Sequence, residues 1–231
     1  MARQQPEQRE PPVAWVRVRY TKVGPARFMS ARDIGRVMER ALKRAQVPVA
    51  YSSGFSPHQR VSYAFPAPTG AASLAEYALV ALAQPMAADD LATALNRALP
   101  TGMEVFAGLT DKRPLPPQLE ASSWELAWPG IVLPPQLDEV VGAFIAEEAV
   151  VVGRRAKSGV KQQDVRSAVV SMTVAKTLNM TLRQSEPLIR PGDVVAGLAT
   201  WCQEVSQWGT AGVFRSGQGR LLADGQVQNL N

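Results

Sequence analysis

Hydrophobic and polar residues alternate in the first strongly patterned stretch of the chain, WVRVRYTKV at positions 15–23. Val16 and Val18 fall on one side of this stretch, and Arg17 and Arg19 fall on the other. A period of two residues is typical of a β-strand that buries one face. The pattern therefore predicts a strand that turns two arginines away from the core.

Residues 30–46 repeat their apolar side chains at the spacing of a helix. The apolar stripe consists of Ile34, Val37, Met38, Ala41, Leu42 and Ala45. Intervals of three and four residues place such side chains on one helical face. Ser30, followed three residues later by Asp33, suits the start of the helix. The opposite face is basic and carries Arg32, Arg36, Arg40 and either Lys43 or Arg44.

Four more elements complete the first half of the chain. Strands are predicted at 60–65, 75–83 and 103–109, and a helix is predicted at 87–100. The order strand, helix, strand, strand, helix, strand is that of the ferredoxin-like, split βαβ arrangement. One face of its sheet packs under the helices, and the other face is expected to be open.

The second half of the chain repeats this order of elements. Strands are predicted at 123–129, 149–155, 168–175, 178–184 and 209–222, and helices at 134–148 and 190–205, with an additional basic loop at 154–166. A proline-rich polar segment separates the two halves and is typical of a linker. We therefore expect an α+β protein with two tandem ferredoxin-like units and antiparallel sheets. Its parts are a disordered leader at 1–12, a domain at 13–110, a linker at 111–122 and a domain at 123–231.

Composition limits the classes of function. No apolar run approaches the roughly 20 residues of a membrane-spanning helix, and residues 1–12 lack the apolar core of a signal peptide. With one cysteine, Cys202, and one histidine, His58, the chain cannot supply a zinc or iron–sulfur ligand set. We therefore expect a cytoplasmic protein with no metal, no cofactor and no membrane contact.

Charge is distributed unevenly along the 231 residues. Residues 1–60 contain twelve Lys or Arg and four Asp or Glu, residues 61–150 contain three and eleven, and residues 151–231 contain ten and five. Clustered Lys and Arg are the electrostatic signature of proteins that bind nucleic acid, although they also occur on ordinary solvated surfaces. The residues we expect to contact RNA are Arg17, Arg19, Arg27, Arg32, Arg36, Arg40, His58, Arg60, Lys161 and Arg166.

His58 lies in the stretch YSSGFSPHQRVSYAF, residues 51–65, beside Arg60. A neutral imidazole titrates near physiological pH, so His58 could be a general acid or base in metal-free RNA cleavage. It could equally bind the backbone of its own loop, or contact an RNA base. The sequence leaves these three interpretations open.

The stretch GPARFMSARDIGRVMERALKRAQVPVAYSSGFSPHQRVSYAFPAPTG, residues 24–70, resembles the opening of a bacterial family of unknown function known as radical-SAM-linked proteins. VKQQDVR, residues 160–166, resembles the second half of that family. Members are fused to, or encoded beside, a radical-SAM protein with a cobalamin-binding-like domain. The resemblance therefore implies a radical-SAM partner. One departure is Ala31, where the family usually has a histidine.

From these observations we expect a non-catalytic accessory module. It would bind an RNA, such as a tRNA or a ribosomal RNA, and work with a separately encoded radical-SAM enzyme. One alternative is a metal-independent ribonuclease that uses His58. A second alternative is a protein-interaction adaptor that docks through its acidic middle, residues 61–150, and binds no RNA.

Overall fold

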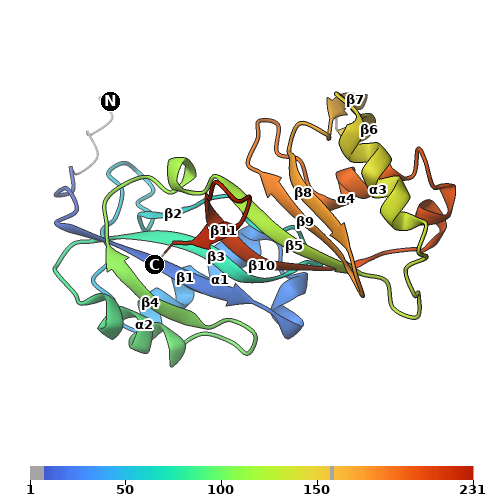
Figure 1. The fold of residues 1–231 in the computed structure, drawn as a ribbon. Coiled ribbons are helices and arrows are strands. Elements are labelled where there is room, and N and C mark those ends of the chain that lie inside the picture. Colours follow the sequence, from blue (N-terminus) through green and yellow to red (C-terminus); the bar gives the residue numbers. More distant parts are fainter. Residues whose placement is uncertain (1–7, 157–158, 231) are drawn as a thin grey trace. The chain divides into compact units, whose positions relative to one another are not determined.

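The computed structural model describes residues 8–156 and 159–230, and it is a mixed α+β structure (Figure 1). The chain divides into two compact units, the first ending at Gln118 and the second running Leu119–Leu230. Of the expected leader, residues 1–7 lie outside the described residues, and residues 8–12 form neither helix nor strand. No helix in the described part of the chain is long and apolar enough to cross a bilayer.

The first unit contains β1 (Ala14–Lys22), the 3-10 turn Gly24–Phe28, α1 (Ala31–Arg44), β2 (Val61–Tyr63), β3 (Ala72–Leu82), α2 (Ala88–Asn96), β4 (Val105–Thr110) and the 3-10 turn Pro116–Gln118. Its strands lie in the order β4, β1, β3, β2. Each is antiparallel to its neighbours. The predicted order of elements is therefore present in this unit.

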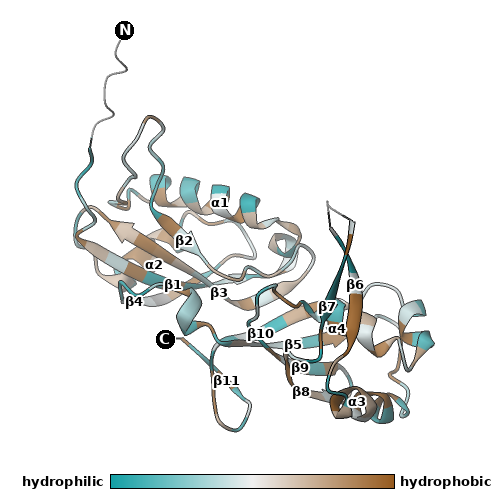
Figure 2. Cartoon of the chain, turned by 90° about the horizontal axis from the view of Figure 1, so that it is seen from above, coloured by the Kyte–Doolittle hydropathy of each residue, from teal (hydrophilic) through white to brown (hydrophobic). Residues whose placement is uncertain are grey.

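The core of the first unit lies between one face of this sheet and the two helices. Val16, Val18 and Tyr20 of β1 are buried there, as the alternating pattern predicted. Ile34, Met38 and Leu42 of α1 and Leu91 and Leu95 of α2 pack into the same cluster. Polar residues lie along the outward side of α1, and apolar residues face the strands (Figure 2).

A capping box fixes the start of α1. The Asp33 N–H donates to the Ser30 hydroxyl at 3.2 Å, and the Ser30 N–H donates back to the Asp33 carboxylate at 3.3 Å. The Ser30 hydroxyl also donates to this carboxylate at 2.6 Å. These bonds from Ser30 hold the pKa of the Asp33 carboxyl below its usual value. They satisfy backbone groups that the first turn of a helix otherwise leaves unpaired.

The second unit contains β5 (Ala121–Ala127), α3 (Leu137–Ala146), β6 (Val151–Ala156), β7 (Gly159–Asp164), β8 (Val169–Val174), β9 (Leu178–Arg183), α4 (Pro191–Leu198), the 3-10 turn Gln203–Gln207, β10 (Gly212–Leu221) and β11 (Val227–Asn229). Its sheet has the order β11, β10, β5, β9, β8. All of these pairings are antiparallel.

The structure corrects the expected basic loop at 154–166. Most of this segment belongs to a separate two-stranded sheet in which β6 pairs with β7, and Arg154 lies opposite Lys161. The sheet strand that follows α3 is therefore β8. Most of β6 lies within the strand predicted at 149–155. β7 was missed because residues 159–162 are all exposed, so its sequence lacks the alternation that reveals a half-buried strand.

A glycine allows close packing of the helices in the second unit. A side-chain carbon added at Gly197 of α4 would lie 3.0 Å from Phe144 of α3 and 3.1 Å from Val165. Phe144 also meets Trp201 edge to face, with ring centroids 6.1 Å apart. Such spacing leaves little room for even one additional methyl group.

Arg17 does not stand on an open sheet face, contrary to the sequence-based expectation. The residue is only 4% exposed, and its guanidinium donates to the carboxylate of Asp111 at 2.8 Å and to the side-chain oxygen of Gln118 at 2.7 Å. Residues 111–118, expected to be linker, thus fold back to this side chain of β1. Leu115 in the same segment is buried. The two-residue period correctly placed Arg17 on the face opposite Val16 and Val18. It could not show that residues 111–118 contact Arg17 on that face.

The capping box predicts the effect of Ser30→Ala. Losing the hydroxyl leaves the N–H of Asp33 without its acceptor, so the free energy of unfolding should fall by about 1 kcal/mol. Ser30→Thr, which keeps a capping hydroxyl, should lose less. Urea denaturation of the three proteins measures this. Equal stabilities of the alanine variant and the wild type would contradict it.

Asp111→Asn should lower the free energy of unfolding at neutral pH by about 2 kcal/mol, because it removes a counter-charge from the buried Arg17 guanidinium. The bond from Arg113, and then the charges of Arg113 and Arg17, hold the pKa of Asp111 below its usual value. The stabilisation is therefore complete above the unfolded-state pKa of about 3.9 and is lost as the pH falls through the lower folded-state pKa.

Urea denaturation between pH 7 and pH 2 measures the difference between Asp111→Asn and the wild type. Arg113→Gln is the matched control. It removes the exposed partner of the same carboxylate and should cost under about 1 kcal/mol. A difference between Asp111→Asn and the wild type that does not shrink in acid would contradict the assignment.

Candidate functional site

The outward face of α1 presents a row of exposed cations. Arg32, Arg36 and Arg40 follow one another at intervals of four residues, about 6 Å apart along the helix axis. Only Arg36 has an ion-pair partner among the described residues, Asp33 at 3.9 Å. Because Ile34, Met38 and Leu42 are buried on the opposite side, the helix cannot rotate to cover this row. The predicted basic face is therefore present and exposed.

The histidine loop lies between α1 and β2 and is closed at its base by pairing of Tyr51 with Gln59. His58 is exposed, and its Nδ1 lies 2.9 Å from the hydroxyl of Ser52. The backbone N–H of His58 donates to the same hydroxyl at 3.1 Å, and the N–H of Ser52 donates to the carbonyl of His58 at 2.9 Å. These mutual bonds brace the loop. Arg60 follows as an exposed cation.

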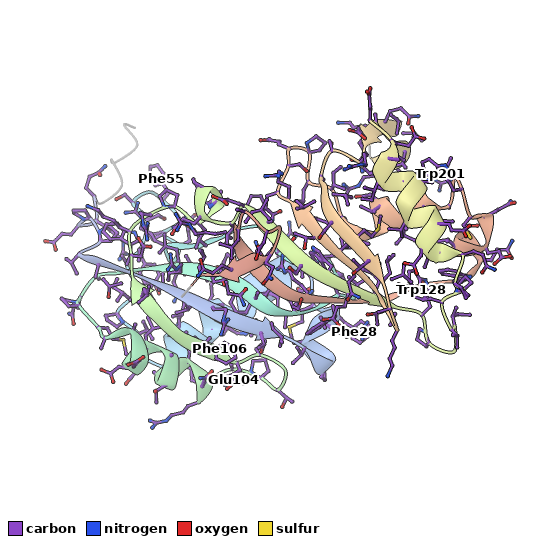
Figure 3. All side chains as sticks on the ribbon, in the orientation of Figure 1. Phe28, Phe55, Glu104, Phe106, Trp128 and Trp201 are labelled. Atoms are coloured by element: carbon purple, nitrogen blue, oxygen red, sulfur yellow. The ribbon has the colours of Figure 1, made fainter. Side chains whose placement is uncertain are left out.

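Two other predicted contacts in the first unit are engaged by protein groups. The Arg19 guanidinium lies 4.7 Å from the centroid of the Phe106 ring, which projects from β4 (Figure 3). Arg27 donates to the carbonyl of Gly70 at 2.7 Å. Both side chains remain partly exposed. The guanidinium groups of Arg17, Arg19 and Arg27 therefore contact other groups of the first unit. The arginines of the row on α1 are exposed.

Lys161 and Arg166 belong to the second unit and differ from each other. Lys161 is exposed on β7. The Arg166 guanidinium donates to the carbonyl of Ile145 at 3.1 Å and to the carbonyl of Val169 at 3.0 Å. Arg166 therefore holds the end of α3 to the start of β8. The sequence analysis expected Arg166 to contact RNA. In the structure, its guanidinium is bonded to these two carbonyls of the protein.

A pocket of about 110 Å³ lies beneath the first turn of α1. Its walls come from β1, α1, β2, β3 and the segment before β3, and they include Tyr20, Lys22, Ala31, Tyr63, Ala67 and Glu76. Ala31 is exposed, whereas Tyr20, Lys22 and Glu76 are each about 2% exposed. The pocket therefore extends from the surface at the start of α1 into the core. Ala31 is the position where the resembled family has a histidine.

Two buried charges fix one wall of this pocket. The Lys22 ammonium donates to the carbonyls of Ala67 and Pro68 at 3.2 and 2.9 Å, and the Glu76 carboxylate accepts from the N–H of Ala67 at 3.1 Å. Buried charges are tolerated where such bonds compensate their desolvation. This wall, part of the PAPTG turn at 66–70, is thereby held in one conformation. No sequence pattern singled out Lys22 or Glu76, because isolated charged residues in strands usually face solvent.

Tyr63 is the one wall residue of this pocket whose hydroxyl is buried and without a hydrogen-bond partner in the described structure. Burial, and then the nearby carboxylate of Glu39, raise the pKa of this hydroxyl well above its usual value. The group therefore stays protonated and can donate. The sequence analysis placed Tyr63 in a strand and assigned it no role in a site.

The described residues contain no group of three His, Cys, Asp or Glu side chains that could hold a metal ion.

Comparisons with known proteins place the chain in a family without assigning an activity. No curated protein matches it. The crystal structure of an unknown protein from Galdieria sulphuraria matches over 89% of this chain and 98% of its own, with 15% identity and a TM-score of 0.26, which is too low to support an argument. Residues 15–191 match a family described as "Uncharacterized protein conserved in bacteria (DUF2344)". Since this match covers most of the 231 residues, the chain belongs to that bacterial family.

Proposed function

We propose that this protein is a non-catalytic accessory module that binds RNA through the outward face of α1 and works in the cytoplasm with a separately encoded radical-SAM enzyme. The observation that carries the RNA part is the exposed row of Arg32, Arg36 and Arg40. Ionic partners are few along this row, since only Arg36 has one among the described residues. Cations without counter-charges are available to phosphates at little cost.

The chemistry of the row suits a phosphate backbone. An arginine fork forms paired hydrogen bonds to phosphate oxygens and keeps its charge at any physiological pH. Three such groups on one rigid helix would track a strand without reading its sequence. Arg60 and His58, both exposed in the adjacent part of the chain, are secondary candidates for this surface.

The partner part of the proposal rests on the resemblance of residues 24–70 to radical-SAM-linked proteins. A radical-SAM cluster needs three thiolates, and this chain contains one cysteine. We therefore propose that the partner carries out the radical chemistry and that this protein contacts the RNA. A neighbouring gene for a radical-SAM protein with a cobalamin-binding-like domain would support that pairing.

We also infer that both units are variants of the ferredoxin-like fold. The first unit follows the order β, α, β, β, α, β with strand order 4-1-3-2. The second unit gives the same strand order when β5, β8, β9 and β10 are counted as its four strands and the β6–β7 ribbon is treated as an insertion after α3. In this fold the helices pack on one face of the sheet, which is why α1 presents its other side to solvent.

The charge row predicts the salt dependence of RNA binding. Replacing Arg32, Arg36 and Arg40 by glutamine should flatten the plot of log affinity against log salt by about 0.7 for each phosphate that the helix no longer binds, or about 2 in total. Fluorescence anisotropy with a labelled single-stranded RNA measures the slope.

The matched control for this experiment removes the same charge from exposed positions of the second unit, with Lys176, Arg183 and Arg220 changed to glutamine. This variant should keep most of the wild-type slope. Equal reductions in both variants would mean that binding depends on net charge and not on α1. Absence of RNA binding by the wild type would refute the RNA proposal and favour the adaptor function.

The histidine loop predicts that the protein does not cut RNA. In EDTA, the wild type and His58→Ala should both leave a labelled RNA intact on a gel, and His58→Ala should weaken binding by about 1 kcal/mol at most. The reason is that the His58 ring braces its own loop through Ser52. Cleavage by the wild type that His58→Ala abolishes, with affinity unchanged, would instead establish the ribonuclease alternative.

A further inference from the structure

We propose that the histidine loop carries a base-stacking site, in which the exposed ring of Phe55 packs against one unpaired base of the bound RNA. This inference rests on the proposed RNA binding and deepens it by naming a contact to the bases. Its physical basis is the exposure of the Phe55 ring, the bonds that hold the loop, and the charge of the neighbouring side chains.

The Phe55 side chain projects into solvent from the tip of the loop. It is 73% exposed, and Figure 3 shows it at the periphery of the first unit. Among the residues that the structure describes, no other ring and no guanidinium packs against it. A ring left in water forgoes the stabilisation that its burial would provide. The aromatic surface of Phe55 is therefore available to a ligand.

Bonds within the loop keep this ring in its exposed position. On either side of Phe55, Ser52 and His58 bind each other through backbone and side-chain groups at distances of 2.9–3.1 Å. Gly54, which precedes Phe55, has a φ of 121°, a conformation open to glycine but strained for other residues. The loop is thus braced before a ligand arrives. Less conformational freedom is then lost when a base packs on the ring.

The charge beside the loop favours an RNA strand as the occupant. Residues 51–60 contain no Asp or Glu, and Arg60 among them is exposed. Arg9, also exposed, is fastened to the loop, because its N–H donates to the Ser53 hydroxyl at 3.0 Å and its guanidinium lies 5.4 Å from the centroid of the Tyr51 ring. Proteins that hold single strands combine a ring for the base with cations for the backbone. An apolar protein surface would gain nothing from these cations.

Stacking on Phe55 predicts contact without base identity. The ring has no hydrogen-bonding group, and every base has a π-face, so each of the four bases can pack on it. The base has to be unpaired, because single strands, loops and bulges are where bases can be splayed out onto aromatic side chains. The site therefore fits a single-stranded segment or a loop of a folded RNA.

The test compares a uridine decamer with a decamer of equal charge that has the same sugars and phosphates but no bases. The wild type should bind the uridine decamer about tenfold more tightly, as one stacked base would give. Phe55→Ala should remove most of this preference. The variant should keep the wild-type affinity for the base-free decamer and the wild-type slope of log affinity against log salt, because the arginines of α1 remain. Fluorescence anisotropy measures all of these quantities.

Three further variants assign the effect to the ring of Phe55. Phe55→Tyr keeps an aromatic face and should keep the preference, whereas Phe55→Leu keeps apolar bulk without that face and should lose it. Phe28→Ala is the matched control. Phe28 is 66% exposed and lies far from Phe55 in the same unit, and its ring already has the Arg27 guanidinium 5.2 Å from its centroid (Figure 3). This variant should keep the full preference.

Each outcome separates the stacking site from the arginine row. If the wild type binds both decamers equally, or if Phe55→Ala keeps the preference, the stacking site is refuted while RNA binding by α1 stands. An equal loss in Phe28→Ala also refutes it, because the preference would then not belong to the loop. If neither decamer binds, the proposed function fails and the stacking site fails with it. Circular dichroism of each variant establishes that a reduced preference does not come from unfolding.

Discussion

Burial of one stripe of α1 against β1 and β3 is the constraint on which the candidate site depends. Ile34, Met38 and Leu42 enter the core of the first unit, so the remaining side of the helix has to face solvent. The arginines lie on that side by helical geometry alone. The same packing suspends the first turn of α1 above the strands, and the small side chain of Ala31 leaves the space there unfilled. The charge row and the pocket are thus two results of one packing arrangement.

The sequence predicted those features that local periodicity controls. The start of α1 at Ser30 and the core face of β1 followed from three-residue and two-residue patterns. It could not predict partners that come from distant parts of the chain. Arg17 meets Asp111 and Gln118, which lie 94 and 101 residues further along. The pocket was missed for the same reason, because Lys22 and Glu76 become informative only when β1 pairs with β3 and both approach Ala67.

The cationic side chains of the two units lie on different elements and have different bonding partners. In the first unit, the buried cations Arg17 and Lys22 donate hydrogen bonds to loop segments. Arg32, Arg36 and Arg40 are exposed on α1. In the second, Arg166 and Arg154 are held by backbone carbonyls, at Ile145 and Leu188 respectively. Lys161, which is exposed, lies on the β6–β7 ribbon and not on a helix. Net charge alone therefore does not show which cations are accessible, since Arg17, Lys22 and Arg166 are bonded to protein groups.

The hydrogen bonds from Arg17 to the segment after β4 bear on where the first unit ends. A fragment cut at residue 110 would contain every strand and α-helix of that unit, yet it would deprive the Arg17 guanidinium of the acceptors on Asp111 and Gln118. A fragment continued through Gln118 keeps them, and it also retains Leu115. The first unit therefore extends beyond its last strand, and residues 111–118 of the proline-rich segment belong to it.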